Sequence, residues 1–410
     1  MSKKIDCFWA LGALNYKNNK ATTCPRQWDT LSKLDNPLPS DIINQPKFNA
    51  LRKSLWNGQW PYGCKTCEEF EKDNYHPYRL HHRITPEMEE GFDKETGKIK
   101  YSNLKHIEFR FSNACNFSCM HCSSAFSSGW ADKLKNYTAS KEVITANLEQ
   151  LTNVQLNNYS LTADTCNAIF NDLCENFHNI EMIDVSGGEP LYQKQLWNML
   201  DKLKDHPNAK NIRINITSNF NVPNCNYIEL SNKLSNFGQS NIRISVDGGK
   251  NIYPYFRSGK WETLVENINN FRKNNTFTKV EATCTTSVYQ MLDIENVITD
   301  MANLNVDKLH TSFVQFPTYI NPTVIKHKFE QEIKTDLIHL IVDKFNDNPN
   351  IIDICRKILE YFDKKECIEE DYKRFIVYVK TSDKMFKKEF NKHFTKYKIN
   401  FDKNEIEKNE

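Results

Sequence analysis

Three cysteines in one short stretch carry the strongest chemical signal in the sequence. Cys115, Cys119 and Cys122 lie between Asn113 and Ser124 at C-x3-C-x2-C spacing. Iron–sulfur clusters are held by Cys thiolates, so three ligands with no fourth nearby would leave one iron open to a substrate or cofactor. The spacing matches neither ferredoxin runs nor the paired C-x2-C of a zinc ribbon. Three buried thiols and an incomplete zinc site are the plainer alternatives.

A second group of four cysteines lies near the amino terminus. Cys7 and Cys24 flank Phe8–Thr23, a stretch that could form a hairpin, and Cys64 and Cys67 make a C-x2-C pair. Four thiolates from two short segments suit a second iron–sulfur cluster or a structural zinc site. Small irregular domains often need a metal site of this kind for stability. The spacing alone does not choose between the two metals.

Composition limits the classes of function. The 410 residues could hold an α/β barrel with one or two attachments. Lys and Arg total 54 against 52 Asp and Glu, so the formal net charge of +2 gives no reason to expect nucleic acid as a partner. The 13 Cys and the absence of an apolar signal core at the start favour thiolate ligands in a reducing compartment. No apolar run approaches the roughly 18 residues of a membrane span, so we expect a cytoplasmic protein.

β-branched runs alternate with helical spacing between Lys105 and Gln315, which is typical of βαβ units and a parallel sheet. Six repeats predict an α/β fold, a partial (βα)6 barrel of TIM type. Its first crossover, Ser123–Asn179, is long enough for an extra helix. The expected strands are His106–Arg110, Ile180–Val185, Asn211–Thr217, Asn241–Val246, Lys279–Thr285 and Lys308–Gln315. The expected helices are Pro190–Leu203, Tyr227–Phe237, Trp261–Lys273 and Ile294–Leu304, followed by a helical, charged segment, Lys328–Glu410.

Residues on the expected strands alternate between an apolar and a polar face. The apolar face, such as Ile214 and Ile216, suits packing beneath outer helices. A closed TIM barrel fills its lumen with branched apolar side chains, so a polar lumen predicts a binding chamber. Its charged side chains would contact substrate or pair with one another, and they are Glu108, Arg110, Arg213 and Arg243.

The stretch Ser186-Gly187-Gly188-Glu189-Pro190 ends the second expected strand and opens a helix. It falls at the carboxyl edge, where α/β barrels place their sites, and glycines there let the backbone approach a ligand closely. Alone it is weak evidence, because a turn before a helix with Pro at its first position is common.

The cysteine loop and this glycine turn together resemble the signature of the radical S-adenosylmethionine (SAM) superfamily. His121 stands before the third Cys, where an aromatic residue is commoner. The resemblance implies that Cys115, Cys119 and Cys122 bind a [4Fe–4S] cluster whose open iron chelates the methionine part of SAM. Reductive cleavage would release a 5'-deoxyadenosyl radical, with reduced flavodoxin or ferredoxin as electron donor.

The resemblance also implies cofactor-binding residues at the strand ends and before one helix. For the residues near the ribose and the carboxylate, satisfied strand-end polar groups are the alternative. The stretch that would hold the methionine amino group comprises Ser186, Gly187, Gly188 and Glu189. The residues that would flank the ribose or reach the carboxylate are Ser218, Ser245, Asp247 and Arg257.

The amino-terminal cysteines and Leu51–Glu69 resemble the Twitch/SPASM auxiliary-cluster modules of radical SAM enzymes, although here the module precedes the barrel. This resemblance implies an auxiliary [4Fe–4S] cluster at Cys7, Cys24, Cys64 and Cys67, with zinc as the alternative.

We therefore expect an auxiliary module and linker over residues 1–100, the partial barrel over 101–320 and a helical extension over 321–410. The predicted function is a radical SAM enzyme that abstracts hydrogen from a peptidyl or small-molecule substrate, with Arg213, Arg243 and Glu108 as candidate catalytic residues. The alternatives are a nucleic-acid-modifying radical SAM enzyme and a non-catalytic Fe–S sensor or electron carrier. A sensor would need neither Gly187–Glu189 nor a polar chamber.

Overall fold

The computed structural model describes residues 4–17, 20–27, 31–33, 38–72, 78–138, 159–275, 277–366 and 368–399. The chain divides into two compact units. The first comprises Met1–Ala114, Tyr159–Thr217 and Ile228–Asn241, and the second comprises Cys115–Asn158, Ser218–Tyr227 and Ile242–Glu410. The four amino-terminal cysteines therefore belong to the first unit, and the C-x3-C-x2-C loop belongs to the second.

The strands of the first unit follow the order β3-β2-β1-β4-β5-β6. β1 and β2 are antiparallel and form a hairpin within Phe8–Thr23, as predicted, whereas β1, β4, β5 and β6 are parallel. The pairing of β1 with β4 carries the sheet across the boundary expected near residue 100. The bounds are β1 (Ala13–Lys17), β2 (Lys20–Thr22), β3 (Ser32–Lys33), β4 (His106–Phe109), β5 (Met182–Val185) and β6 (Arg213–Ser218).

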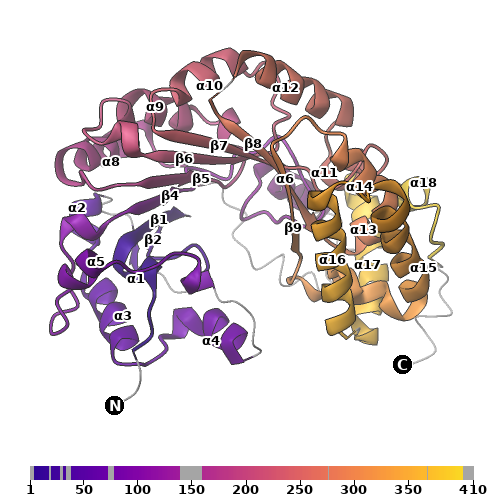
Figure 1. Ribbon diagram of the computed structural model, residues 1–410, viewed down its shortest axis with the longest axis horizontal. Coiled ribbons are helices and arrows are strands. Elements are labelled where there is room, and N and C mark those ends of the chain that lie inside the picture. Colours follow the sequence, from indigo (N-terminus) through magenta and orange to yellow (C-terminus); the bar gives the residue numbers. More distant parts are fainter. Residues whose placement is uncertain are drawn as a thin grey trace. The chain divides into compact units, whose positions relative to one another are not determined.

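Three helices of the first unit lie along one face of β4, β5 and β6 (Figure 1). They are α8 (Ala163–Asn176), α9 (Lys194–Leu203) and α10 (Tyr227–Leu234). A helix that covers a sheet needs one apolar face. α9 has such a face, formed by the fully buried Leu196, Met199, Leu200 and Leu203. The helices that precede β4 are α1 (Phe8–Gly12), α2 (Pro39–Ile42), α3 (Pro46–Trp56), α4 (Lys65–Lys72) and α5 (Pro86–Glu90).

The second unit holds the strands in the order β7-β8-β9, and β8 and β9 are parallel. Their bounds are β7 (Gln239–Ser245), which begins in the first unit, β8 (Lys279–Thr286) and β9 (Lys308–Phe313). The helices before β9 are α6 (Ser128–Thr138), α11 (Tyr253–Arg257), α12 (Trp261–Asn274), α13 (Val288–Met291) and α14 (Ile294–Ala302).

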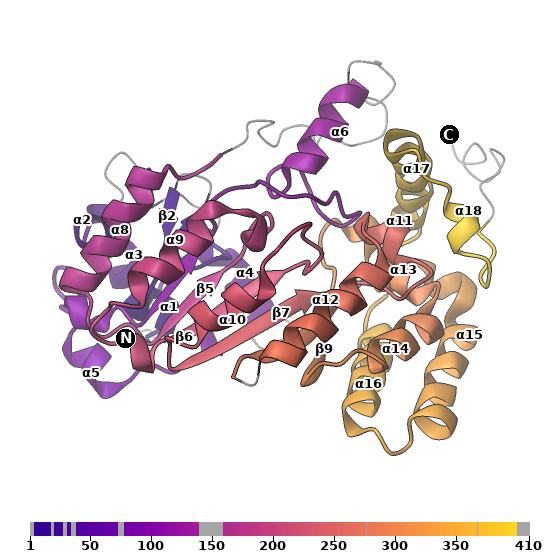
Figure 2. The same cartoon turned by 90° about the horizontal axis from the view of Figure 1, so that it is seen from above.

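The carboxyl-terminal part of the second unit is helical. Figure 2 shows α17 and α18 gathered with α11 and α13. Aromatic contacts connect these helices, because the ring of Tyr289 on α13 packs against those of Phe375 on α17 and Phe390 on α18. The bounds are α15 (Lys326–His339), which continues into a π-helical turn (Leu340–Lys344), α16 (Pro349–Lys364), α17 (Glu369–Phe386) and α18 (Phe390–His393).

Each of the six strands and four helices expected from the sequence has a counterpart, with ends that differ by a few residues. The expected helix Pro190–Leu203 is divided, because a 3-10 turn over Pro190–Tyr192 precedes α9. The long first crossover contains α6 and α8, and its residues 139–158 lie outside the described residues, as does the end of the chain from residue 400.

The apolar face expected from alternation is buried. Ile214 and Ile216 have no exposed surface. On the other face of the first unit, register pairs Glu108 with Asp184 and Asp184 with Asn215 across β4, β5 and β6. The strands thus place a row of polar side chains on one side of the sheet.

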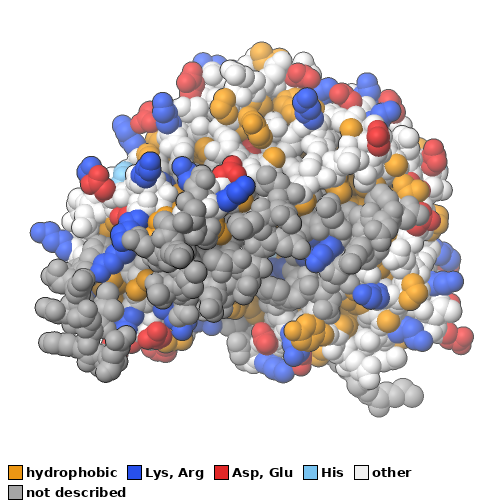
Figure 3. Space-filling view, turned by 180° about the vertical axis from the view of Figure 1, so that it is seen from behind, with side chains coloured by type: hydrophobic (Ala, Val, Ile, Leu, Met, Phe, Trp, Pro, Cys, Tyr) orange, Lys and Arg blue, Asp and Glu red, His pale blue; other side chains and the backbone are white. Residues whose placement is uncertain are grey.

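Charged side chains of both signs are interspersed over the described part of the face shown in Figure 3, as the small net charge suggests. None of the described helices combines the length and the apolar character that a membrane crossing requires.

Candidate functional site

The three cysteines of the C-x3-C-x2-C motif lie in a loop that leads into α6. The Cys122 amide donates to the Cys119 carbonyl at 3.0 Å, which closes a turn between these two ligand candidates. The Met120 amide donates to the carbonyl of Phe256 at 2.9 Å, and the Trp130 indole donates to the carbonyl of Cys119 at 2.9 Å. The loop backbone is therefore fixed by α6 and by α11.

A buried ion pair stands beside this loop. Arg257, at the end of α11, donates from Nη1 to Asp247 Oδ2 at 2.7 Å, and both side chains are almost fully buried. Asp247 also accepts from the amide of Thr285, and its backbone has a φ of 41°, in the left-handed region that Asp tolerates better than most residues. Among the residues that the structure describes, Arg257 Nε is buried and has no hydrogen-bond partner. An acceptor on a bound ligand would satisfy it.

The electrostatics of the loop suit a metal-bound state. Burial raises the pKa of Cys119, with the Arg257 guanidinium opposing it, and burial together with the charge of Cys119 raises the pKa of Cys122 to about 12. Burial lowers the pKa of Arg257, but Cys119, Asp247 and Cys115 outweigh it and hold the group charged. Buried thiols resist ionisation in the absence of a cation, and iron supplies one. The donor set therefore fits an iron–sulfur cluster.

His121 fills the position before the third cysteine. Its ring stacks on Phe256 at a centroid distance of 5.0 Å and an interplanar angle of 13°. Nε2 lies 3.7 Å from Asp247 Oδ2, and Nδ1 is buried with no hydrogen-bond partner in the described part of the chain. His121 therefore packs as an aromatic ring does and adds a second unsatisfied polar atom near the Arg257 pair.

The glycine turn of the first unit packs against the residue that precedes the cysteine loop. The Glu189 amide donates to the Ala114 carbonyl at 2.9 Å. Gly188 has a φ of 55°, and a Cβ there would lie 2.4 Å from the Ala114 oxygen, so only glycine fits this close approach. Gln193 Nε2 donates to Ala114 and to Gly187 carbonyls at 3.1 and 3.2 Å. Glu189 is buried and accepts from the Leu191 amide.

Polar side chains of the first unit form two hydrogen-bonded groups on one side of the sheet. Glu108 Oε1 accepts from Ser186 Oγ at 2.9 Å and from Arg110 Nε at 3.0 Å. Asp184 accepts from Asn215 Nδ2 at 2.6 Å, and His106 Nε2 lies 2.8 Å from its other oxygen. Ser186 and Glu108, predicted separately, are thus in direct contact.

The segment after β6 is tied to the cysteine loop within the second unit. Asn219 donates to the Asn116 side chain at 2.8 Å, and Asn116 donates to the Asn221 carbonyl at 2.9 Å. Ser218 is buried, and its Oγ accepts from the Phe220 amide at 2.8 Å. Ser245 is half-buried at the end of β7, two residues before Asp247.

The two arginines predicted to line the chamber are both exposed, and they have different neighbours. Arg213 is exposed at the first residue of β6 and donates to Gln239 at 2.9 Å. That end of the strand lies away from the carboxyl edge, which favours a structural role. Arg243, at mid-strand in β7, lies 3.7 Å from Glu281, and His310 Nε2 lies 3.2 Å from the same carboxylate.

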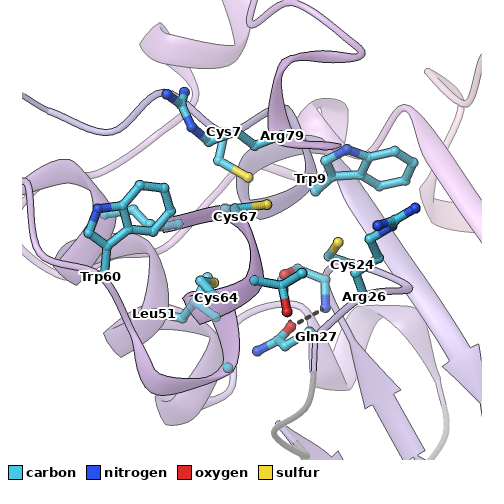
Figure 4. Close-up of a pocket in the computed structure, with 15 residues that line it drawn as sticks. Cys7, Trp9, Cys24, Arg26, Gln27, Leu51, Trp60, Cys64, Cys67 and Arg79 are labelled. Carbon is cyan, nitrogen blue, oxygen red and sulfur yellow. Dashed lines mark hydrogen bonds between the residues drawn. The ribbon is translucent and has the colours of Figure 1, made fainter. Parts of the chain in front are cut away.

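The four amino-terminal cysteines line one cavity in the first unit. Figure 4 shows them on different sides of the same space, with Trp9, Trp60, Arg26 and Arg79 in its wall. Cys7 precedes α1, Cys24 follows β2, and the Cys64–Cys67 pair spans the start of α4. The structure thus brings together four thiols that are separated by up to 60 residues in the sequence.

Two cationic side chains, Arg26 and Arg79, lie in the wall of this cavity, while burial disfavours free thiolates inside it. Burial raises the pKa of Cys7 to about 11 and raises that of Cys24, to which the charges of the other cysteines add. Arg26 lies over the ring of Tyr78 at 5.2 Å, and Tyr78 stacks on Trp9 at 4.7 Å. Among the described residues, no three His, Cys, Asp or Glu side chains are gathered tightly enough to hold one metal ion. The fit of each cysteine set therefore rests on its donor chemistry and surroundings.

The sequence did not identify several residues that hold the cysteine loop or the residue before it. Gln193 donates to the Ala114 carbonyl within the first unit. It lies three residues after Pro190, and this closeness to the glycine turn was the only signal in the sequence. Trp130 is one of several aromatic residues on helices, and nothing in its neighbourhood marks it. Tyr378, whose hydroxyl donates to the Met120 carbonyl, is 258 residues away in the chain, and no local pattern identifies it.

The comparisons with known proteins agree with these features. Residues 109–296 match the family model described as the Radical SAM superfamily. No curated protein matches the chain.

Solved structures resemble the chain at low identity. Native anSMEcpe with bound AdoMet shares 12% identity over 59% of this chain and 59% of that chain, with a TM-score of 0.38. Streptococcus suis SuiB bound to S-adenosylmethionine shares 13% over 68% and 59%, with a TM-score of 0.36. Coproporphyrinogen III oxidase (HemN) from Escherichia coli shares 14% over 63% and 52%, with a TM-score of 0.33. The chain spans little more than half of each structure, and TM-scores this low carry no argument about activity.

Proposed function

We propose that this protein, a radical SAM enzyme by the match of residues 109–296, reductively cleaves SAM and uses the resulting 5'-deoxyadenosyl radical to abstract hydrogen from a substrate. The observation that carries the proposal is the C-x3-C-x2-C loop beside the buried Arg257–Asp247 pair. When bound, a [4Fe–4S] cluster supplies one electron to SAM. The protein binds, orients and shields the reactants.

Cys115, Cys119 and Cys122 are the proposed cluster ligands. Arg257 is the proposed partner of the SAM carboxylate, since its buried Nε has a hydrogen to donate. Asp247 holds that guanidinium in place and keeps it charged.

The remaining cofactor-binding residues are assigned by their positions at strand ends. Gly187 and Gly188 offer backbone without side chains, and both have positive φ. Ser186 and Glu189 flank them, and Ser218 and Ser245 end the third and fourth strands of the predicted barrel. Glu108 and Arg243 stay candidates for contact with the substrate.

An auxiliary [4Fe–4S] cluster at Cys7, Cys24, Cys64 and Cys67 is part of the proposal, with zinc as the alternative. It is supported by the shared cavity and by the cationic side chains in its wall. Reduced flavodoxin or ferredoxin is the proposed electron donor, and a peptidyl or small-molecule compound is the proposed substrate. The fold and the charge distribution give no separate support to a nucleic-acid substrate.

The test is metal analysis and SAM cleavage on anaerobically reconstituted full-length protein. The triple variant Cys115→Ala, Cys119→Ala, Cys122→Ala should lose about four iron atoms per chain and all reductive formation of 5'-deoxyadenosine, while it retains the amino-terminal metal. Cys24→Ser should lose the other metal and keep uncoupled SAM cleavage. Cys166→Ala, a buried thiol on α8 outside both sets, is the matched control and should keep both.

Unchanged iron content with full SAM cleavage in the triple variant would overturn the assignment. Zinc in the amino-terminal site of the wild-type protein would remove its redox role and leave the main proposal intact.

A further inference from the structure

A lysine from the carboxyl-terminal helices reaches the neighbourhood of the cysteine loop. The chain turns after α17 through Lys387, which has a φ of 54°, and this turn directs Lys388 toward α11. Lys388 Nζ donates to the carbonyl of Tyr255 and to Ser258 Oγ, the latter at 3.0 Å. The ammonium is therefore held next to the residue that follows Arg257.

Neighbouring side chains hold this turn in place. Asp383 Oδ2 accepts from the Phe390 amide at 2.8 Å, and Oδ1 accepts from the Tyr255 hydroxyl at 2.8 Å. Both α11 and α18 thus bind the same carboxylate of α17. The position of Lys388 is fixed from both sides rather than left to a flexible side chain.

From Lys388 the contacts continue to the cluster ligands. Ser258 Oγ donates to the Ser118 carbonyl at 3.3 Å, and Ser118 directly precedes Cys119. The Tyr378 hydroxyl of α17 donates to the carbonyl of Met120, which directly follows Cys119. The carboxyl-terminal helices therefore contact the backbone after Cys119 directly, through Tyr378, and the backbone before it indirectly, through Ser258.

A third contact reaches the same cysteine through α6. Phe386 packs edge-on against the ring of Trp130 at 5.3 Å, and the Trp130 indole donates to the Cys119 carbonyl.

The charges of Lys388 and Cys119 attract each other. Burial lowers the pKa of Lys388 to about 8, and the negative charges of Cys119 and Asp383 oppose that shift. At neutral pH the ammonium is still largely protonated, and a negative cluster beside it would hold the proton more firmly. The positive charges of Arg257 and Lys388 both act to lower the pKa of Cys119, against the effect of burial.

We propose that Lys388 is a positioning residue of the cluster loop whose positive charge raises the reduction potential of the [4Fe–4S] cluster. Reduction adds one electron, supplied by a flavodoxin- or ferredoxin-type donor, and hence one negative charge to the cluster. A cation held nearby in a poorly solvated site stabilises that added charge. This assigns a role to the carboxyl-terminal helices, and it rests on the proposed function.

Lys388→Met tests the charge, because methionine preserves much of the length of the side chain. The full-length protein is reconstituted anaerobically, and the cluster potential is measured by redox titration followed by EPR, with iron content and melting temperature recorded in parallel. We expect a shift of the potential to a more negative value in Lys388→Met and in Lys388→Gln, and a value near wild type in Lys388→Arg. Lys384→Met changes an exposed lysine of α17; it is the matched control and should leave the potential unchanged.

Tyr378→Phe separates the charge from the hydrogen bond. This variant should lower the melting temperature of the loaded protein and its retention of iron, with the potential close to wild type.

Four outcomes overturn the inference. A cluster-loaded Lys388→Met or Lys388→Gln protein with the wild-type potential would show that the charge has no effect. An equal shift in Lys384→Met would show that any positive charge acts. A shift in Lys388→Arg as large as that in Lys388→Met would make the role steric. A wild-type chain that binds no cluster at Cys115, Cys119 and Cys122 would overturn the proposed function itself, so the two failures are distinguishable.

Discussion

Gly188→Ala offers the sharpest test of the contact between the glycine turn and Ala114, both within the first unit. The φ of 55° is left-handed, which costs a residue with a Cβ about 1–2 kcal/mol. The new methyl group would also lie 2.4 Å from the Ala114 oxygen and 2.9 Å from the Ser112 oxygen, both backbone atoms. Such overpacking costs about 1–3 kcal/mol. The expected total is therefore about 2–5 kcal/mol, unless Ala114 moves away.

The loss of stability and the movement of Ala114 can be measured separately. For a unit of this size about 1 kcal/mol lowers the melting temperature by roughly 2–4 °C, so we expect a loss of about 4–20 °C. If Ala114 moves instead, Cys115 moves with it, and SAM affinity should fall by about tenfold or more, equivalent to ~1.4 kcal/mol. Thermal unfolding of the apo-protein and equilibrium SAM binding to the cluster-loaded protein distinguish the two.

Gly129→Ala is the matched control for this change. Gly129 lies in the first turn of α6 without a positive φ, and a Cβ there would meet the Phe117 oxygen at 3.1 Å. The better helix propensity of Ala, about 1 kcal/mol, offsets that tight contact. Wild-type melting and SAM binding in Gly188→Ala, or an equal loss in Gly129→Ala, would refute the argument.

Two further predictions concern buried charge. Asp247→Asn breaks a buried ion pair and should lower the free energy of unfolding of the apo-protein, measured in urea, by about 3–5 kcal/mol. The double variant with Arg257→Met should be destabilised by less than the sum of the two single changes. Strict additivity would contradict the pairing. Burial lowers the pKa of His206, whose Nδ1 accepts from the Asn208 amide and whose Nε2 faces the Phe177 carbonyl. The His206 ring therefore binds a proton more readily in the unfolded chain than in the folded one. The free energy of unfolding should fall as the pH drops through about 6.5. His206→Asn should show a smaller loss of melting temperature between pH 7 and pH 5.5, and an identical loss in both proteins would refute the role of His206.

The sequence was informative where the pattern is local. Strand alternation placed β4 to β9, because a period of two residues is visible within each strand. The parallel pairing of β1 with β4 was not foreseen. Its register joins Ala13 to His106, so it depends on a contact across more than 90 residues, and nothing in the short segment Ala13–Lys17 specifies that partner. The hairpin with β2 was foreseen because its two strands are neighbours in the chain.

The same distinction holds for the candidate sites. Ligand spacing within a loop is a local property, so Cys115, Cys119 and Cys122 could be recognised directly, and the glycine turn likewise. Their electrostatic environment is not local. Arg257 lies 138 residues beyond Cys119, and Lys388 a further 131 residues beyond Arg257.

What brings these two cations to the loop is burial of apolar and aromatic side chains on helices. Phe256 stacks on His121, and Phe386 packs on Trp130. Each of these phenylalanines stands within two residues of a cation, Arg257 in the first case and Lys388 in the second. The aromatic residue supplies the packing free energy that holds the neighbouring charge in a poorly solvated place. Sequence periodicity identifies the buried aromatic residues of a helix, but it does not show which loop they pack against. The family resemblance pointed to Arg257, whereas the approach of Lys388 to the loop becomes visible only in the folded chain.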